Sequence, residues 1–228
     1  MSKNDAAKAG DLEKALSSLF DAERRVRELH DEIAQHDSEK LCDVVAKSIT
    51  TAIQESDAAE ASMRLERLSA LLGELETPRS VDLLVDILAT DHPDARSAAG
   101  ERLESLAFDR FKEVARGVER ALKRLPVGSP ALPELPYLLA EVPEPGVVKL
   151  LEQFLAHEDP DAVAAAIEVA VEVGEPSIAA FIEKLKDDKR TVEMSDENED
   201  TAEVTIAELA ADALSIFEAM AEEAEEAN

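Results

Sequence analysis

Hydrophobic residues recur along this chain with the spacing of one helix face. In residues 11–36 they stand seven positions apart, at Leu12, Leu19, Val26 and Ile33. This spacing predicts a long amphipathic helix whose apolar seam packs against another helix. A companion seam is interrupted at Glu23. Packing in a helix bundle and pairing in a coiled coil are therefore equal alternatives.

The same periodicity predicts two further helices, at residues 38–55 and 60–75. These patterns divide the chain into N-terminal amphipathic helices, residues 1–57, and a second domain, residues 58–228. The N-terminal helices either cap the second domain or bind a partner through the first helix. Self-association through that helix is one form of such binding.

The second domain repeats itself along the sequence. Residues 137–162 match residues 70–95 without a gap, at a constant offset of 67 positions that places Pro145 on Pro78. A third copy begins at Ile206. Each unit holds four predicted helices, so the elementary repeat is a helix pair of about 33 residues, a length typical of helical repeat proteins.

Two matching segments, DHPDARSAAG at residues 91–100 and EDPDAVAAAI at residues 158–167, resemble the short bacterial and archaeal form of the HEAT repeat. The resemblance covers about residues 59–220. It implies an all-α fold, an α-solenoid of about four to five HEAT-like helix pairs with an N-terminal helical cap. The inner surface of such a solenoid is lined by the second helix of each pair. Those helices are expected at residues 60–75, 94–107, 136–142, 161–173 and 204–220.

Two joints between the repeats differ in character. Residues 125–136, LPVGSPALPELP, predict a stiff proline-rich connector. Their counterpart, residues 188–202, predicts a polar acidic loop. Its carboxylates are Glu193, Asp196, Glu197, Glu199 and Asp200. Unlike loops at equivalent places are where repeat proteins often vary their specificity.

Charge narrows the classes of partner. The 228 residues carry a formal net charge of −28, which opposes binding of nucleic acid or anionic lipid over a large surface. We expect a protein partner, no nucleic acid and no membrane insertion. The chain has one cysteine, Cys42, and shows no apolar signal region, so a cytoplasmic location is expected. The acidic bias also fits a source adapted to high salt.

One helix reverses the local charge. Residues 110–124 hold six basic side chains, against the acidic Glu113 and Glu119. The six, which we call the basic stripe, are Arg110, Lys112, Arg116, Arg120, Lys123 and Arg124. They either dock an acidic partner or form an ordinary solvated helix face. The sequence is compatible with both interpretations.

The segment FLAHEDPDA, residues 154–162, places His157 beside three carboxylates and suggests a metal site. Its counterpart 67 positions earlier, ILATDHPDA, keeps only the features of a helix joint. HEAT-like deoxyhypusine hydroxylases hold iron with repeated His-Glu pairs, whereas this chain has one such pair. We therefore expect no catalytic residue, cofactor or metal.

The sequence thus predicts a non-catalytic adaptor or scaffold that binds a protein or peptide on the solenoid surface. The alternative is a HEAT-like lyase or an accessory subunit of an enzyme complex. HEAT motifs define a fold better than a function. The candidate partner-binding residues are the basic stripe together with Leu12, Leu19, Val26 and Ile33.

Overall fold

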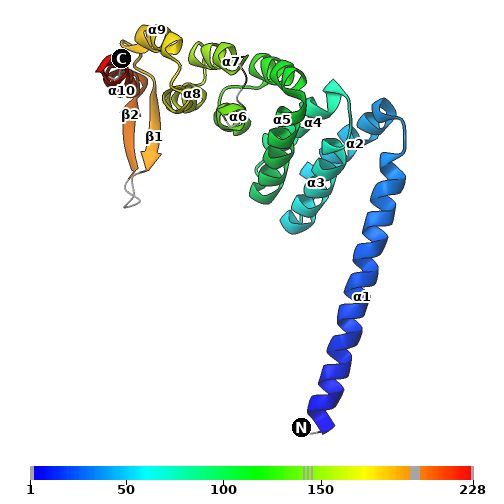
Figure 1. Cartoon of the computed structure of the whole chain (residues 1–228). Coiled ribbons are helices and arrows are strands. Elements are labelled where there is room, and N and C mark those ends of the chain that lie inside the picture. The colour runs from blue at the N-terminus through cyan, green and yellow to red at the C-terminus, as the bar shows by residue number, and fades with distance from the viewer. Residues whose placement is uncertain (1–2, 141, 143, 145, 196–200, 227–228) are drawn as a thin grey trace.

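The computed structural model describes residues 3–140, 142, 144, 146–195 and 201–226 (Figure 1). These residues are mostly helical, which confirms the all-α class, with one small sheet as the exception. The α-helices are α1 (Lys3–Ala34), α2 (Ser38–Ile53), α3 (Ala58–Gly73), α4 (Pro78–Leu88), α5 (Pro93–Arg124), α6 (Ala131–Ala140), α7 (Gly146–Leu155), α8 (Pro160–Val173), α9 (Ala179–Ile182) and α10 (Ile206–Glu226). Short 3-10 turns, Pro176–Ile178 and Glu183–Leu185, flank α9.

The helices form two rows along an arch, with α1 projecting from one end (Figure 1). Helix α5 belongs to both rows because its backbone leaves the helical region at Arg110. One row contains α2, α4, the second half of α5 and α7. The other contains α3, the first half of α5, α6, α8 and α10. Each helix packs against the next one in its row.

Prolines at the joints of the repeat predict helix starts. Pro78, Pro93 and Pro160 each occupy the first turn of a helix, where a missing N–H costs no intrahelical hydrogen bond. The side chains of Thr77 and Asp159 accept hydrogen bonds from the first-turn N–H groups of α4 and α8. Pro145, which the repeat places at another helix start, lies outside the described residues.

The core between the rows is aliphatic, as the scarcity of aromatic residues requires. Phe154 is the aromatic side chain among the largest fully buried ones. The others are leucines and isoleucines that lie on successive helices: Leu65, Leu72, Leu84, Ile87, Leu88, Leu103, Leu132, Leu135, Leu139, Leu151 and Ile178. The buried cluster runs continuously from α2 to α10.

The proline-rich joint is shorter than predicted. Helix α6 already begins at Ala131, so only residues 125–130 form the connector. Pro133 lies in the first turn of α6, where proline is tolerated. Pro136 lies inside the helix and is buried. The expected second helix at 136–142 is therefore displaced toward the N-terminus.

The predicted acidic loop at 188–202 is wrong for part of its length. Strands β1 (Thr191–Ser195) and β2 (Thr201–Thr205) pair antiparallel, with Thr191 opposite Thr205 and Val192 opposite Val204. Threonine and valine favour the pleated backbone, and this propensity outweighs the acidic composition. Glu193 lies in β1, whereas Asp196, Glu197, Glu199 and Asp200 lie outside the described residues.

The N-terminal helix α1 does not cover the end of the helical rows as a cap. It extends away from the arch (Figure 1). Its four predicted seam residues, Leu12, Leu19, Val26 and Ile33, are exposed. In contrast, α2 packs on α3 and α4 and buries Cys42. Within the described residues, no helix is long and apolar enough to cross a membrane.

Candidate partner-binding surfaces

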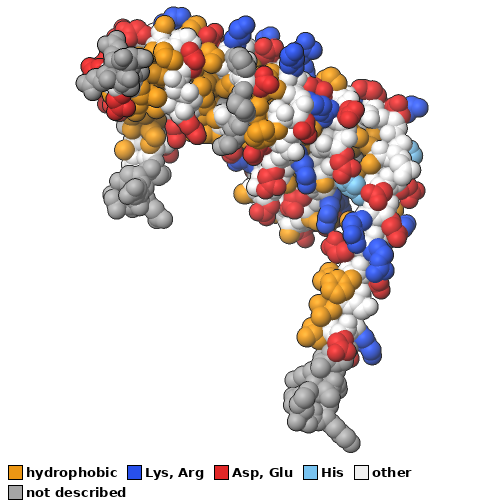
Figure 2. All heavy atoms as spheres, in the orientation of Figure 1, with side chains coloured by type: hydrophobic (Ala, Val, Ile, Leu, Met, Phe, Trp, Pro, Cys, Tyr) orange, Lys and Arg blue, Asp and Glu red, His pale blue; other side chains and the backbone are white. Residues whose placement is uncertain are grey.

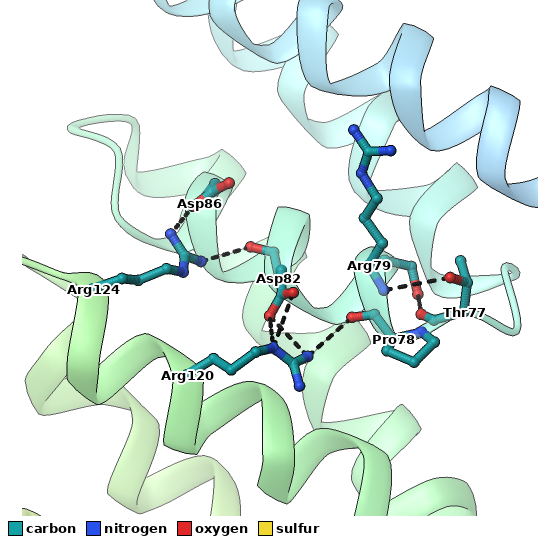
Figure 3. Close-up of polar contacts among 8 residues, drawn as sticks. Thr77, Pro78, Arg79, Asp82, Asp86, Arg120 and Arg124 are labelled. Carbon is teal, nitrogen blue, oxygen red and sulfur yellow. Dashed lines mark hydrogen bonds and ion pairs between the residues drawn. The ribbon is translucent and has the colours of Figure 1, made fainter.

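The basic stripe on α5 is largely engaged by the protein itself. The Nε atom of Arg120 donates to both carboxylate oxygens of Asp82 on α4, at 3.0 and 3.1 Å (Figure 3). Arg124 pairs with Asp86, one turn further along α4, and donates to the Asp82 carbonyl at 2.9 Å. Burial raises the pKa of Asp86 although Arg124 opposes that rise.

Arg110 is also used internally. Its Nη2 atom donates to the Leu75 carbonyl at 3.1 Å, and its Nη1 atom donates to Glu113 at 3.4 Å. Three of the six side chains in the basic stripe, Arg110, Arg120 and Arg124, are thus bonded within the chain.

Three members of the basic stripe are left for solvent. Lys112, Arg116 and Lys123 are exposed and make no side-chain hydrogen bond to another described residue. Lys112 and Arg116 line an open cleft of about 570 Å³, whose lining also includes Asp109, Glu113 and Glu144. The cleft therefore carries both signs of charge and lacks the uniformly positive field that would attract an acidic partner.

The joint that contains His157 is held by a dense set of hydrogen bonds. The Nδ1 atom of His157 accepts from the Asp159 N–H at 3.1 Å, so the neutral ring donates from Nε2 to the Leu122 carbonyl at 3.1 Å. Asp159 is buried and also accepts from the Gly128 N–H at 2.6 Å. These bonds join α5, the 125–130 connector and α8.

Arg190 fixes the same joint from the C-terminal side. It donates to the carbonyls of His157 and Glu158, at 2.7 and 2.9 Å. Asp188 orients the guanidinium, and this contact lowers the pKa of Asp188. The cluster is therefore a structural joint in this chain. Among the described residues, no group of three or more His, Cys, Asp or Glu side chains is placed to hold a metal.

A groove that the sequence did not reveal lies between α6, α8, α10 and β1. Its volume is about 460 Å³. We call it the acidic groove. It is lined by Pro133, Tyr137, Asp161, Ala164, Ala165, Ile167, Glu168, Val171, Val192, Glu193, Met194, Leu209, Asp212, Ala213 and Ile216. Three of its large apolar side chains, Tyr137, Met194 and Ile216, remain between 41% and 45% exposed.

Every charged side chain in the lining of the acidic groove is a carboxylate: Asp161, Glu168, Glu193 and Asp212. Burial, reinforced by the charges of Asp159 and Glu193, raises the pKa of Asp161. The Tyr137 hydroxyl donates to Glu168 at 2.6 Å; burial and this hydrogen bond raise the pKa of Tyr137. The groove thus combines an apolar surface with unneutralised negative charge.

Helix α1 offers the second exposed apolar surface. Its predicted seam is solvent-accessible along its length, from Leu12 at 62% to Ile33 at 36%. Figure 2 shows hydrophobic side chains gathered on this projecting helix. Near its C-terminal end, His30 Nε2 lies 3.0 Å from the Glu74 carboxylate and ties α1 to the end of α3. The four seam residues remain together on one surface, separate from the basic stripe.

Sequence reasoning missed the acidic groove because β1 forms one of its walls and was expected to be a loop. The alternation of Thr191, Val192 and Met194 was the available signal for a strand. The bonds of Asp159 to Gly128 and of Arg190 to His157 could not be predicted because the two partners lie more than 30 positions apart.

Comparison with known proteins adds little to these surfaces. No family model matches the chain, and no curated protein matches it. A crystal structure of an engineered protein from the Northeast Structural Genomics Consortium aligns over 85% of this chain and 89% of its own. It is 18% identical, with a TM-score of 0.35. That likeness is too distant to assign either a family or a function.

Proposed function

We propose that this chain is a non-catalytic adaptor, built as an α-solenoid of HEAT-like helix pairs. It binds a segment of a protein partner in the acidic groove. The segment carries basic side chains that face the carboxylates and apolar side chains that enter the groove. The observation that carries the proposal is the coincidence of exposed Tyr137, Met194 and Ile216 with a wholly acidic set of charged lining residues.

Contacts between successive helix pairs support the solenoid. Side chains repeatedly bond across 31 to 38 positions, about the length of one helix pair. In one row these contacts are Asp43 with Arg79, Asp82 with Arg120, and Asp86 with Arg124. In the other they are Arg96 with Glu134 and Tyr137 with Glu168. Stacked repeats make such nearest-neighbour contacts.

The chemistry of the acidic groove favours a protein segment as its occupant. Tyrosine and methionine are enriched at protein interfaces, where they supply large and adaptable contact area. Residues 125–228 hold five basic and 26 acidic side chains. Their field attracts a basic segment over distance and accelerates its association. The same field repels nucleic acid and acidic peptides.

The test is a binding titration of the full chain with synthetic peptides. The probe is an amphipathic peptide of alternating lysine and leucine, and its counterpart carries glutamate in place of lysine. We expect the basic peptide alone to bind, with an affinity that falls as salt rises because screening weakens the attraction. Equal binding of both peptides would contradict the proposal.

Charge reversal locates the binding site. Glu193→Lys with Asp212→Lys places two positive charges in the acidic groove. This double substitution should weaken binding of the basic peptide at least tenfold. The matched control, Glu175→Lys with Asp187→Lys, makes the same change at exposed residues outside the groove lining. It should weaken binding only slightly. Equal losses in both variants would show general charge attraction instead of a site.

A further inference from the structure

Helix α1 projects from the body of the protein and carries an apolar surface that no other described helix covers. Leu12 and Leu19 are 62% and 54% exposed. Between α1 and the rest of the described chain, the side-chain hydrogen bond is that of His30 with Glu74, near the base of the helix. Helices in proteins gain most of their stability by packing an amphipathic face. A projecting helix of 32 residues therefore calls for a partner.

Large and small residues alternate along this surface of α1 from Leu12 to Val26, and Leu29 follows. Positions spaced three and four apart are Leu12, Ala15, Leu19, Ala22, Val26 and Leu29. All of them are exposed. In a parallel pair, leucine would meet leucine and alanine would meet alanine, which leaves some layers overfilled and others empty. In an antiparallel pair, the four central layers each join a large residue to a small one, and leucine meets leucine only in the two outer layers.

Charge selects the same arrangement. Residues 3–34 contain six basic and eight acidic side chains, a net of −2, which leaves −26 for the rest of the chain. Parallel helices would bring two such bodies together at one end. Antiparallel helices centred between Phe20 and Asp21 separate the two bases by roughly 40 Å, at 1.5 Å per residue. That distance exceeds the screening length of about 8 Å at physiological ionic strength.

We propose that a second copy of this chain covers the seam. The two α1 helices pair antiparallel, with Leu19 against Ala22 of the second copy, Ala15 against its Val26, and Leu12 against its Leu29. Beside the central layers charged side chains face uncharged ones, because Ser18 lies by Arg25 of the second copy and Leu16 by its Glu23. Asp11 and Glu32 of the second copy form an acidic pair only at the outer ends. The pairing is independent of what the acidic groove binds.

The mass of the full chain in solution tests the pairing. Light scattering during size-exclusion chromatography should give twice 24.7 kDa for the native chain. Leu19→Glu with Val26→Glu should give the monomer mass. The matched control, Ser17→Glu with Arg24→Gln, changes the net charge equally on the opposite face of α1 and should remain dimeric. A native chain that is monomeric at every concentration would overturn the proposal. The seam would then be a surface for a different protein.

Introduced cysteines test the orientation. Chains with Ala15→Cys mixed with chains with Val26→Cys should form a disulfide under mild oxidation, detected as a doubled mass on a non-reducing gel. Ala15→Cys alone should not form one, because antiparallel pairing holds the two copies of residue 15 roughly 16 Å apart along the axis. The native Cys42 is buried and does not compete. Efficient linkage of Ala15→Cys alone would overturn the antiparallel arrangement.

Discussion

The basic stripe on α5 and the acidic groove between α6, α8, α10 and β1 are both charged surfaces. They differ in whether their charges are paired within the chain. Arg120 and Arg124 reach carboxylates one helix pair away. In the groove, Glu193 and Asp212 make no side-chain hydrogen bond or ion pair to another described residue. Charges already paired inside a chain contribute to its fold, whereas unpaired charges beside an apolar groove are available for binding. Substitutions in the two regions separate these two roles.

The largest effect is expected at Gly117, where α5 packs against α4. A Cβ atom at Gly117 would lie 2.3 Å from Val81 Cγ1, and Val81 is fully buried. Gly117→Ala should therefore lower the free energy of unfolding by about 2 kcal/mol, because overpacking outweighs the gain in helix propensity. Urea unfolding measures this change.

Gly100, on the first half of α5, is the matched control. A Cβ atom there would meet its nearest neighbours at 3.8 and 3.9 Å, ordinary contact distances. Gly100→Ala should raise the free energy of unfolding by about 0.5–1 kcal/mol. Similar changes in the two variants would mean that the α4–α5 contact is looser than described.

The acidic groove should show the opposite pattern, with binding lost and stability kept. Met194→Ala with Ile216→Ala removes two side chains that are 42% and 45% exposed. We expect weaker binding of the basic peptide by about tenfold, or 1.4 kcal/mol. The free energy of unfolding should change by less than about 0.5 kcal/mol, as for other surface substitutions. A large loss of stability would instead make these residues part of the core.

Removing paired arginines should affect stability alone. Arg120→Ala with Arg124→Ala breaks two partly exposed ion pairs and leaves Asp86 without its partner. Exposure limits the loss to about 1 kcal/mol in the free energy of unfolding. Lys112→Ala with Lys123→Ala, on the same helix, should leave the free energy of unfolding unchanged. Weaker peptide binding in either double variant would contradict the division of roles.

The smallest effect is the pH dependence of the joint at Asp188. Arg190 lowers the pKa of Asp188 in the folded state. The stabilisation is therefore complete above the ordinary aspartate pKa and is lost as the pH falls toward the lowered value. Asp188→Asn should destabilise the protein near neutral pH and have less effect in acid. A difference between the two proteins that is constant with pH would contradict this account.

Local structure could be predicted from the sequence because it depends on neighbouring residues. The predicted helix at 38–55 is α2, Ser38–Ile53, and Pro78, Pro93 and Pro160 mark helix starts. The strand at Thr191–Ser195 was missed because acidic composition was weighed above β propensity.

The roles of charged side chains could not be predicted in the same way, because they depend on tertiary packing. Nothing local to Arg120 or Arg124 shows that Asp82 and Asp86 lie opposite them. The equal 38-position spacing of the two pairs was, however, present in the sequence. The acidic groove required the hairpin wall as well as the helices, so composition alone could not reveal it.

The most direct test of the central claim is methyl NMR of the full chain during addition of the basic peptide. If the acidic groove is the binding site, the signals of Ile167, Met194 and Ile216 should shift, while those of Val114 and Val118 on the basic-stripe half of α5 stay unchanged. Shifts concentrated on Val114 and Val118, with the groove signals unchanged, would contradict the account.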